Sequence, residues 1–326
     1  MSNIKLSIII PCYNVESYLP KTLHSLSCLK KTDDCEFIFV NDGSKDSTLN
    51  IIQDFVKQNS SAILINQPNQ GVSVSRNNAL QKVRGEYILC LDGDDYLDSN
   101  AVEIINNNIQ NFDLLISPCI KDYSNRQEIF NLNIPNGEYS VEQLYTLCKV
   151  FPLAPKLVYR TSIIKNNNLL FNPQIKCGEV YDFTVSFLKY ATNIKVINKA
   201  FYYYVMRENS ATQKPNYKAD LSVLKVLYNF SCLQNNWKFS QSFLLTAFKL
   251  VTNFTYNKYV RNNLSDKETL DVIIQVLNNN HFRKILSLLS VKSMNLKDKL
   301  YVSYFKYMPI KLGYLLCVYL QRIIKF

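Results

Sequence analysis

Short apolar runs alternate with helix-like stretches through the first hundred residues, and this alternation limits the fold more than any other feature. The run Lys5 to Pro11 (KLSIIIP) has the continuous apolar pattern of a strand buried on both faces of a parallel sheet. Similar runs follow at Cys35 to Asn41, Ala62 to Asn66 and Glu86 to Leu91. Helical stretches separate them, at Ser17 to Leu29, Ser47 to Gln58 and Ser73 to Val83. The pattern predicts an α/β fold with a doubly wound sheet and right-handed crossovers.

Polar and acidic residues stand where three of these predicted strands end. The three segments are Pro11-Cys12-Tyr13-Asn14, Asn41-Asp42-Gly43-Ser44 and Asp92-Gly93-Asp94-Asp95. In doubly wound sheets, ligands bind beyond the carboxyl ends of the strands. We therefore expect a binding site among these segments.

The last segment places three carboxylates within four residues, at Asp92, Asp94 and Asp95. Carboxylates this close repel one another, so they stay ionised together only where a cation sits among them. Oxygen ligands suit Mg²⁺ or Mn²⁺, and a site with one or two carboxylates completes its coordination with phosphate oxygens and water. The cluster predicts a metal-bound diphosphate. The plainer alternative is an acidic turn that caps the next helix.

Two common phosphate-binding motifs are absent from the sequence. No G-x-G-x-x-G follows the first strand, and no G-x-x-x-x-G-K-[ST] occurs anywhere. Phosphate recognition is therefore expected to come mainly from a metal ion.

Four segments in order resemble the inverting glycosyltransferases of family 2. They are SIIIPCYN (7–14), VNDGSKDST (40–48), NQGVSVSRNNAL (69–80) and GEYILCLDGDDYL (85–97). The close resemblance covers residues 4–100, and a weaker one extends to residue 212. It implies the GT-A fold, a Rossmann-like doubly wound mixed sheet. It also implies transfer of a sugar, with inversion, from a nucleotide-diphosphate sugar to a hydroxyl group, the donor being typically a UDP-sugar.

The resemblance assigns roles to residues of the nucleotide site. Pro11 and Tyr13 match positions that line the nucleoside pocket, and Asp42 matches the acid that hydrogen-bonds the base. Arg76 matches an arginine that meets phosphate or braces the acidic cluster. The alternatives are that Asp42 caps the helix beginning at Ser47 and that Arg76 makes a surface ion pair.

The acidic cluster matches the family's DxD element, in which one Asp contacts ribose and another binds the metal. Asp92 is then a nucleotide contact, and Asp94 is the first choice of metal ligand. Asp95 is the second choice, because the sequence does not divide the work between these two neighbours.

The resemblance places the catalytic base in an acidic pair that opens a helix. The corresponding stretch is CGEVYDF (177–183), in which Glu179 is kept and Val180 replaces the usual Asp. Glu179 is the leading candidate and Asp182 the second, each as a general base for the acceptor hydroxyl. Alternatively, both are first-turn acids that favour a helix N-terminus, or the departure at Val180 marks a slow or silent enzyme.

An aromatic strand resembling that of the family follows at Tyr202-Tyr203-Tyr204-Val205, with Arg207 two residues further. In relatives this segment closes over the diphosphate, so Arg207 is expected to neutralise the departing nucleotide. The plain alternative is an edge strand whose tyrosines pack on neighbours. Lys156 also matches a recurring family lysine, without an assigned role.

The basic charge of the chain belongs to its later part. Residues 215–326 carry 16 Lys or Arg against 5 Asp or Glu, and the pattern becomes helical there, with Ser265 to Glu268 as a capping box. We predict a GT-A domain over 1–214 and a helical basic region over 215–326. The tail 312–326 suits an anionic membrane interface, although packing on its own domain is equally compatible.

Cysteine usage and hydropathy bear on the compartment. The nine cysteines form no CxxC pair, which favours a reducing environment. The longest apolar run near the end, Leu312 to Leu320, is about half of what a bilayer requires. We expect a cytoplasmic protein, peripheral on the inner face of the cell membrane.

The sequence thus favours a metal-dependent UDP-sugar transferase with Mn²⁺ or Mg²⁺ as cofactor and a glycan, lipid-linked or protein-linked acceptor. The alternatives are a catalytically silent sugar-nucleotide-binding or scaffold protein and, less favoured, a nucleic-acid-binding protein. The acidic cluster argues against nucleic acid as a partner.

Overall fold

The computed structural model describes residues 4–130, 132, 134–147, 156–207, 216–226, 241–252, 255 and 267–307. The chain forms two compact units. The first comprises Met1–Leu144, Ala154–Pro173 and Phe183–Arg207. The second comprises Tyr145–Leu153, Gln174–Asp182 and Glu208–Phe326.

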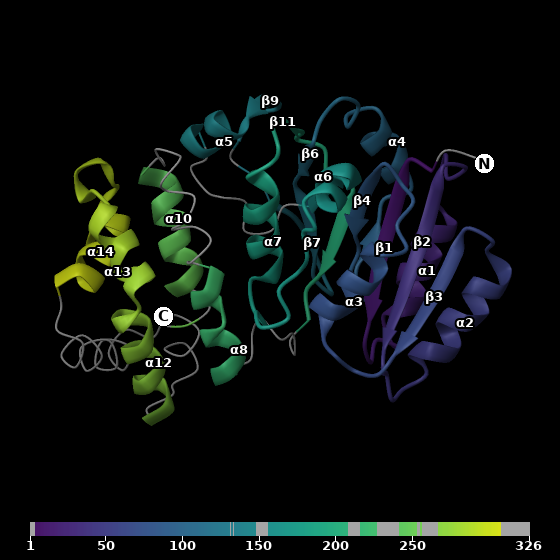
Figure 1. Ribbon diagram of the computed structural model, residues 1–326, viewed down its shortest axis with the longest axis horizontal. Helices are drawn as coiled ribbons and strands as arrows, with labels where there is room; N and C mark the ends of the chain where they lie inside the picture. Colours follow the sequence, from purple (N-terminus) through teal and green to yellow (C-terminus); the bar gives the residue numbers. More distant parts are fainter. Residues whose placement is uncertain are drawn as a thin grey trace. The chain divides into compact units, whose positions relative to one another are not determined.

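An eight-stranded sheet in the order β3-β2-β1-β4-β10-β6-β11-β9 is the centre of the first unit (Figure 1). Four of its strands are the ones that the sequence predicts. They are β1 (Leu6–Cys12), β2 (Cys35–Asp42), β3 (Ala62–Gln67) and β4 (Tyr87–Cys90). All four are parallel, since β1 pairs in parallel with both β2 and β4, and β2 with β3. The predicted α/β doubly wound sheet is confirmed.

Three helices connect these parallel strands: α1 (Leu19–Ser27), α2 (Thr48–Gln58) and α3 (Val72–Leu80). The chain runs from β1 outward to β2 and β3, and then returns to the other side of β1 for β4. Right-handed crossovers therefore put α1 and α2 on one face and α3 on the other. The sheet order reverses between β1 and β4, and this reversal is the place where doubly wound sheets bind ligands.

The other half of the sheet makes it mixed. It consists of β10 (Lys156–Arg160), β6 (Leu114–Ser117), β11 (Asn193–Val196) and β9 (Gly137–Ser140). Strand β10 is antiparallel to both β4 and β6, so β6 runs in the same direction as β4. Strand β11 is parallel to β6, and β9 is antiparallel to β11 at the sheet edge.

A four-stranded sheet in the order β5-β12-β7-β8 completes the first unit. Its strands are β5 (Tyr96–Leu97), β7 (Cys119–Asp122), β8 (Gln127–Phe130) and β12 (Tyr202–Val205). The tyrosine strand β12 has a neighbour on each side, so the alternative of an edge strand is wrong. Short helices α4 (Ala101–Asn106), α5 (Val141–Leu147), α6 (Thr161–Asn166) and α7 (Glu179–Leu188) fill the connections.

Burial explains why the central strands form where the apolar runs occur. Every residue of β1 and β2 is buried. The side chains of Ile8, Ile10 and Phe39 on one face join the core that also contains Leu19 and Leu23 of α1. Each fully buried Ile or Phe contributes roughly 1.5–3 kcal/mol relative to an exposed position, so the sheet positions the strand ends firmly.

From residue 216 onward the described part of the second unit is mainly helical, as the sequence predicts for the C-terminal region. Its helices are α8 (Tyr217–Leu221), α10 (Gln241–Thr252), α12 (Lys267–Asn278), α13 (Asn280–Leu288) and α14 (Leu296–Tyr307). Phe248 stacks on Phe282 and meets Phe305 edge-on. The first two residues of the predicted capping box and the tail 312–326 lie outside the described residues. No helix in the described ranges combines the length and apolar character needed to cross a bilayer.

Candidate active site

The ends of β1 and β4 lie side by side at the reversal of the sheet. The pairing runs from Leu6 beside Tyr87 to Ile9 beside Cys90. Beyond it, Leu91 N donates to Ile9 O at 2.9 Å, and Gly93 N donates to Pro11 O at 3.2 Å. The acid loop (residues 92–95) therefore continues along the end of β1, as the strand-end argument predicts.

Gly93 allows this close approach. A Cβ atom at Gly93 would lie 2.7 Å from Cys12 Sγ and 3.0 Å from Pro11 O. On the other side, the Thr22 hydroxyl lies 3.0 Å from Gly93 O and 2.7 Å from Asp95 O. The acid loop is thus fixed between β1 and α1.

Each carboxylate of the acid loop has its own partner. Asp92 Oδ1 accepts from Arg76 Nη2 at 2.8 Å, and Asp94 forms an ion pair with Arg207. Asp95 accepts from the Tyr202 hydroxyl at 2.6 Å and from Val205 N at 2.8 Å. Asp95 is 1% exposed, whereas the side chains of Asp92 and Asp94 are 36% and 14% exposed. The first two acids are therefore more open to a ligand than the third.

The pKa values of the three carboxylates shift differently, because their charged neighbours differ. Burial acts to raise the pKa of Asp92, but the Arg76 and Lys156 charges outweigh it and leave that pKa below its ordinary value. Burial and the neighbouring Asp92 charge raise the pKa of Asp94, only partly offset by Arg207. Burial also raises the pKa of Asp95, against the attraction of Lys156. Both Asp94 and Asp95 would therefore be stabilised by an added cation, and Asp94 is the more exposed of the two.

Arg76 and Lys156 brace the loop from within the fold. Arg76 projects from α3, is 3% exposed and lies with its guanidinium carbon 5.3 Å from the Phe171 ring centre. It is therefore a buried partner of Asp92, and the alternative of a surface ion pair is wrong. Lys156 Nζ lies 3.8 Å from Asp95 Oδ2 and 3.6 Å from the Tyr202 ring centre. These contacts supply the structural role that the sequence did not reveal.

Arg207 reaches the acid loop from just beyond β12. Its side chain is 30% exposed, and its guanidinium carbon lies 4.9 Å from the ring centre of Tyr18, in the loop after β1. The Tyr202 hydroxyl also accepts from Asp92 N at 3.1 Å while it donates to Asp95. Two contacts therefore join β12 to the acid loop. One comes from Tyr202 at the start of the strand, and the other from Arg207 just beyond its end.

Asp42 at the end of β2 holds the neighbouring loop. Its Oδ1 accepts from Gln67 Nε2 and Gln70 N, and its Oδ2 accepts from Gly71 N, each at 2.8 Å. The residue is 3% exposed. Because a carboxylate oxygen has two acceptor positions, Oδ2 keeps one beyond the Gly71 bond. Thr48 N bonds Asp46, at 3.1 Å, so Asp46 makes the local contact at the start of α2 that the alternative assigned to Asp42.

The loops after β1 and β2 are tied to each other by side chains that sequence reasoning missed. Asn14 Oδ1 accepts from Lys45 N at 2.8 Å, and Glu16 Oε2 accepts from Ser47 N at 2.8 Å. In return, Asp46 Oδ2 accepts from Glu16 N at 3.0 Å. Asn14, with φ of 50°, takes the left-handed conformation that Asn tolerates. The dense Asn, Asp and Ser content of both loops was the available signal.

Pro11 and Tyr13 lie on either side of the last residue of β1. Pro11 is buried within the strand, opposite Val40 of β2. Tyr13 follows the strand and is 46% exposed. Tyr13 therefore offers an aromatic face at the carboxyl ends of the parallel strands, where Asp42 and the acid loop also lie.

The two candidate bases lie in the first turn of α7, the part of that helix that belongs to the second unit. Gly178 precedes them with φ of 86°, and Asp182 N donates to Gly178 O at 3.1 Å. Glu179 is half-buried, whereas Asp182 is 4% exposed. Both lie in the first turn, where the helix dipole favours negative charge. Of the two, Glu179 is the more accessible.

The acid loop suits one kind of metal site. Within the described ranges, no three His, Cys, Asp or Glu side chains are arranged to enclose a metal ion. Asp94 and Asp92 are nevertheless two hard oxygen donors, and burial together with mutual repulsion favours a cation beside Asp94. Mg²⁺ or Mn²⁺ bound by one or two carboxylates, with phosphate and water as the remaining ligands, fits this donor set.

Residues 7–161 match the family model described as "Glycosyl transferase family 2". This segment of the chain belongs to glycosyltransferase family 2. It is 31% identical to the uncharacterized glycosyltransferase EpsJ of Bacillus subtilis (strain 168) over 219 residues, covering 64% of this chain and 63% of EpsJ.

A second relative is longer. The chain is 29% identical over 213 residues to the poly(ribitol-phosphate) β-N-acetylglucosaminyltransferase TarS of Staphylococcus aureus (strain Mu50 / ATCC 700699). This match covers 63% of the chain and 36% of TarS. The chain thus spans less than two thirds of both relatives.

Solved structures of two glycosyltransferases share the fold. The crystal structure of S. aureus TarS 1-349 in complex with UDP-GlcNAc superposes with a TM-score of 0.70 at 21% identity, covering 98% of this chain and 92% of that one. The mannosyltransferase PcManGT from Pyrobaculum calidifontis, in complex with GDP-Man and Mn²⁺, gives 0.56 at 11% identity, with coverage of 98% and 87%. At these identities the likeness shows the fold alone, and that fold is GT-A-like with a helical C-terminal region.

Proposed function

We propose that this protein is an inverting glycosyltransferase that moves a sugar from a UDP-sugar to a hydroxyl of a glycan, glycolipid or glycoprotein acceptor. The observation that carries the proposal is the acid loop at the reversal of the sheet order. In this loop Asp92 forms an ion pair with Arg76, and Asp94 forms one with Arg207. Acids and arginines at this edge suit a ligand that combines a diphosphate with a sugar and a base.

The residues at the strand ends support the donor pocket that we propose. Tyr13 packs against the uracil, Pro11 forms the pocket floor, and the remaining acceptor position of Asp42 receives the imide N–H of the base. Asp92 accepts from a ribose hydroxyl while it holds Arg76. The support for Asp42 is its position at the end of β2 and its fixed carboxylate.

We assign the metal to Asp94, with Asp92 as its neighbour, and give Asp95 a different role. Asp95 is buried and already accepts two hydrogen bonds from β12, so a cation there would have to displace both. When bound, Mn²⁺ or Mg²⁺ supplies positive charge to the diphosphate. Asp95 instead fixes the loop that presents Asp94.

The reaction moves one proton and exchanges one bond at the anomeric carbon. Glu179 takes the proton from the acceptor hydroxyl, whose oxygen attacks the anomeric carbon as the bond to the β-phosphate oxygen breaks. Arg207 neutralises the charge left on UDP. Asp182 is the second candidate base, and its low exposure favours Glu179.

One relative supports the acceptor class that we propose. TarS is named for poly(ribitol-phosphate), and we propose a bacterial surface or protein-linked glycan as the acceptor here. The basic C-terminal region supports peripheral contact with an anionic inner membrane surface. The location that we propose is therefore cytoplasmic, at that surface.

Release of nucleoside diphosphate tests the proposal. The full chain is incubated with UDP-, GDP- and dTDP-sugars, with Mn²⁺ or with EDTA, alone and with uncharged or phosphate-containing glycan acceptors. We expect metal-dependent release from one UDP-sugar. Asp94→Asn and Arg207→Ala should each lower kcat by about 10²- to 10³-fold, as loss of a charge-stabilising group does elsewhere.

The control and the base test complete this experiment. Asp54→Asn on α2 removes an acid whose side chain is 70% exposed and should leave release unchanged. Glu179→Gln should abolish transfer while UDP binding, measured by calorimetry, persists. Binding of UDP without release from any donor would identify a silent binding protein, and absence of both would end the glycosyltransferase proposal.

A further inference from the structure

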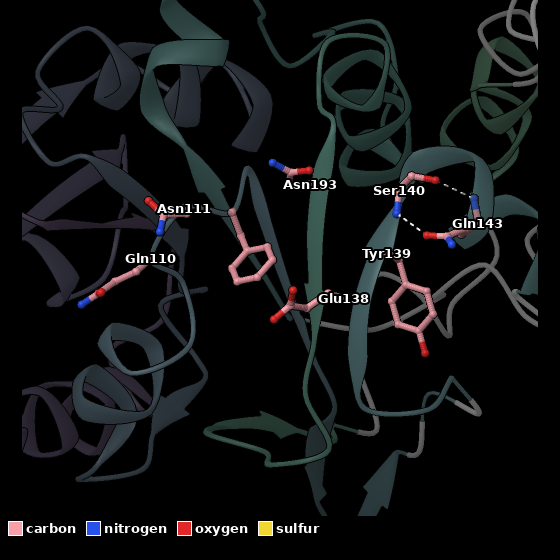
Figure 2. A pocket seen from close by; sticks show the side chains of 8 residues that line it. Gln110, Asn111, Glu138, Tyr139, Ser140, Gln143 and Asn193 are labelled. Carbon is pink, nitrogen blue, oxygen red and sulfur yellow. Dashed lines mark hydrogen bonds between the residues drawn. The ribbon is translucent and has the colours of Figure 1, made fainter.

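A pocket lies at the other end of the strands of the same sheet, away from the acid loop. It has a volume of about 550 Å³, within the size range of ligand sites. Figure 2 shows its walls: the loop after α4 with Gln110 and Asn111, the end of β9 with Tyr139 and Ser140, and Asn193 at the start of β11.

The strand directions separate this pocket from the acid loop. Strands β6 and β11 run in the same direction as β4, and the pocket lies where they begin. The acid loop lies where β4 ends. At about 3.3 Å per strand residue, the two sites are roughly 20 Å apart, so the nucleotide diphosphate held at one does not reach the other.

Side-chain amides dominate the pocket wall. Among the residues drawn in Figure 2, the marked hydrogen bonds join only Ser140 and Gln143. The amides of Gln110, Asn111 and Asn193 are therefore not used within the wall. Each amide offers two donors and an acceptor, which matches the hydroxyl group, itself both donor and acceptor.

The pocket has balanced charge and some aromatic surface. Its one acid, Glu138, pairs with Lys195 at 3.0 Å, and Lys195 Nζ lies 5.4 Å from the Phe112 ring centre. An anion gains little from a site whose charges cancel, and an apolar ligand would leave the amides without partners. An uncharged sugar, with hydroxyls for the amides and a C–H face for Phe112, satisfies both requirements.

The wall is held in place before any ligand arrives. Ser140 N donates to Gln143 Oε1 at 2.8 Å, and Gln143 N donates to Ser140 Oγ at 3.1 Å. Asp113 Oδ2 accepts from Thr192 N at 2.7 Å and from Asn193 N at 3.2 Å. A preformed site loses less entropy on binding, so even a shallow polar pocket can hold a sugar.

We propose that this pocket binds a segment of an uncharged glycan chain. With the proposed transferase activity, on which this consequence rests, the segment is a distant part of the acceptor chain. Binding it raises the effective concentration of the reacting end, so transfer to long acceptors is favoured over transfer to short ones.

Calorimetry on the full chain tests the site directly. The probes are chitohexaose and maltohexaose, both uncharged, and inorganic polyphosphate as a sugar-free polyanion. We expect at least one oligosaccharide to bind, and the double variant Gln110→Ala/Asn193→Ala to weaken it at least fivefold. Both residues are exposed, so the fold should be preserved. The matched control is Asn50→Ala/Gln53→Ala, two exposed amides on α2.

UDP binding is measured on the same proteins and separates the two proposals. Loss of oligosaccharide binding with unchanged UDP affinity supports the glycan pocket, whether or not transfer is found. The glycan pocket is overturned if neither oligosaccharide binds, if the double variant binds as well as the control, or if polyphosphate is the ligand that the double variant loses.

Discussion

The Tyr202 hydroxyl forms hydrogen bonds with two residues of the acid loop. It donates to Asp95 at 2.6 Å and accepts from Asp92 N at 3.1 Å, in a fully buried position. Burial and the Asp95 charge raise the pKa of this phenol well above its ordinary value, so it keeps its proton. A single buried hydroxyl therefore fixes both the backbone and a side chain of the loop.

Removing that hydroxyl should cost stability. Tyr202→Phe leaves a buried N–H and a buried carboxylate each short of one partner, and we expect a loss of about 1–3 kcal/mol in the free energy of unfolding by urea. The control is Tyr203→Phe, which keeps the stacking on Tyr96 at 4.4 Å and should change stability by less than about 0.5 kcal/mol. Equal effects of the two substitutions would show that the bridge contributes nothing.

Glu36 gives a pH-dependent term to stability. Burial acts to raise its pKa, but bonds from the Ser7 hydroxyl, at 2.6 Å, and from Arg84 outweigh it and hold that pKa below the ordinary 4.5. A lowered folded-state pKa contributes stability that is present above the unfolded pKa and is lost as pH falls through the folded one.

Glu36→Gln should therefore destabilise the protein most above about pH 5. We expect a difference of about 1–3 kcal/mol there, mainly from the bonds to Ser7 and the Arg84 backbone, because the Arg84 side chain is 67% exposed. The difference should shrink below pH 4.5. Urea unfolding of both proteins between pH 3.5 and 7 measures it, and a difference that grows towards acid would refute this account.

The connection after β4 shows how one element positions the site. Its Gly93 lies where a Cβ would be 2.7 Å from Cys12 Sγ, so the acid loop can follow β1 only with glycine. Gly93→Ala should displace the loop and weaken UDP binding at least tenfold by calorimetry. Gly137→Ala is the control, because its Cβ would meet only the end of the Tyr139 side chain, with the hydroxyl at 3.3 Å. Unchanged UDP affinity in Gly93→Ala would mean that the loop does not bind the nucleotide.

Elements with continuous apolar runs were predictable, and those fixed by distant partners were not. The sequence places β1 to β4 within one or two residues of their bounds, because the runs are continuous and apolar. Strands β1 and β2 are buried throughout, whereas β3 lies at the edge of the sheet and is partly exposed. The four-residue strands β7 and β8 carry mixed patterns and were not predicted. Strand β12 was expected at its observed bounds from the family resemblance, but its pairing was not, since it joins residues as far apart as Tyr203 and Ile120.

The active-site residues were predictable to the same extent: their positions could be predicted from local sequence, but their contacts with distant residues could not. The strand-end positions of Asp42 and the acid loop were predictable, since parallel strands end at one edge. The division of work was not, because it depends on contacts such as that of Val205 N with Asp95, 110 positions apart in the chain. The roles of Asp94 as metal ligand and Glu179 as base remain predictions.

For the molecule as a whole, ligand binding should raise the free energy of unfolding. A ligand that binds only the folded state stabilises it by about 2.7 kcal/mol at one hundred times its Kd. We expect UDP with Mn²⁺ to raise Tm by a few degrees, and UDP with EDTA to raise it much less. Asp94→Asn should lose the Mn²⁺-dependent part, measured by calorimetric melting. Equal shifts with Mn²⁺ and with EDTA would mean that the nucleotide binds without metal.

The most direct test of the central claim is a crystal structure of the full chain with UDP and Mn²⁺. The account predicts uracil beside Tyr13 and Asp42 and the diphosphate between Asp94 and Arg207, at the ends of β1 and β4. UDP bound anywhere else on the chain, including the amide-lined pocket at the far edge of the sheet, would contradict it.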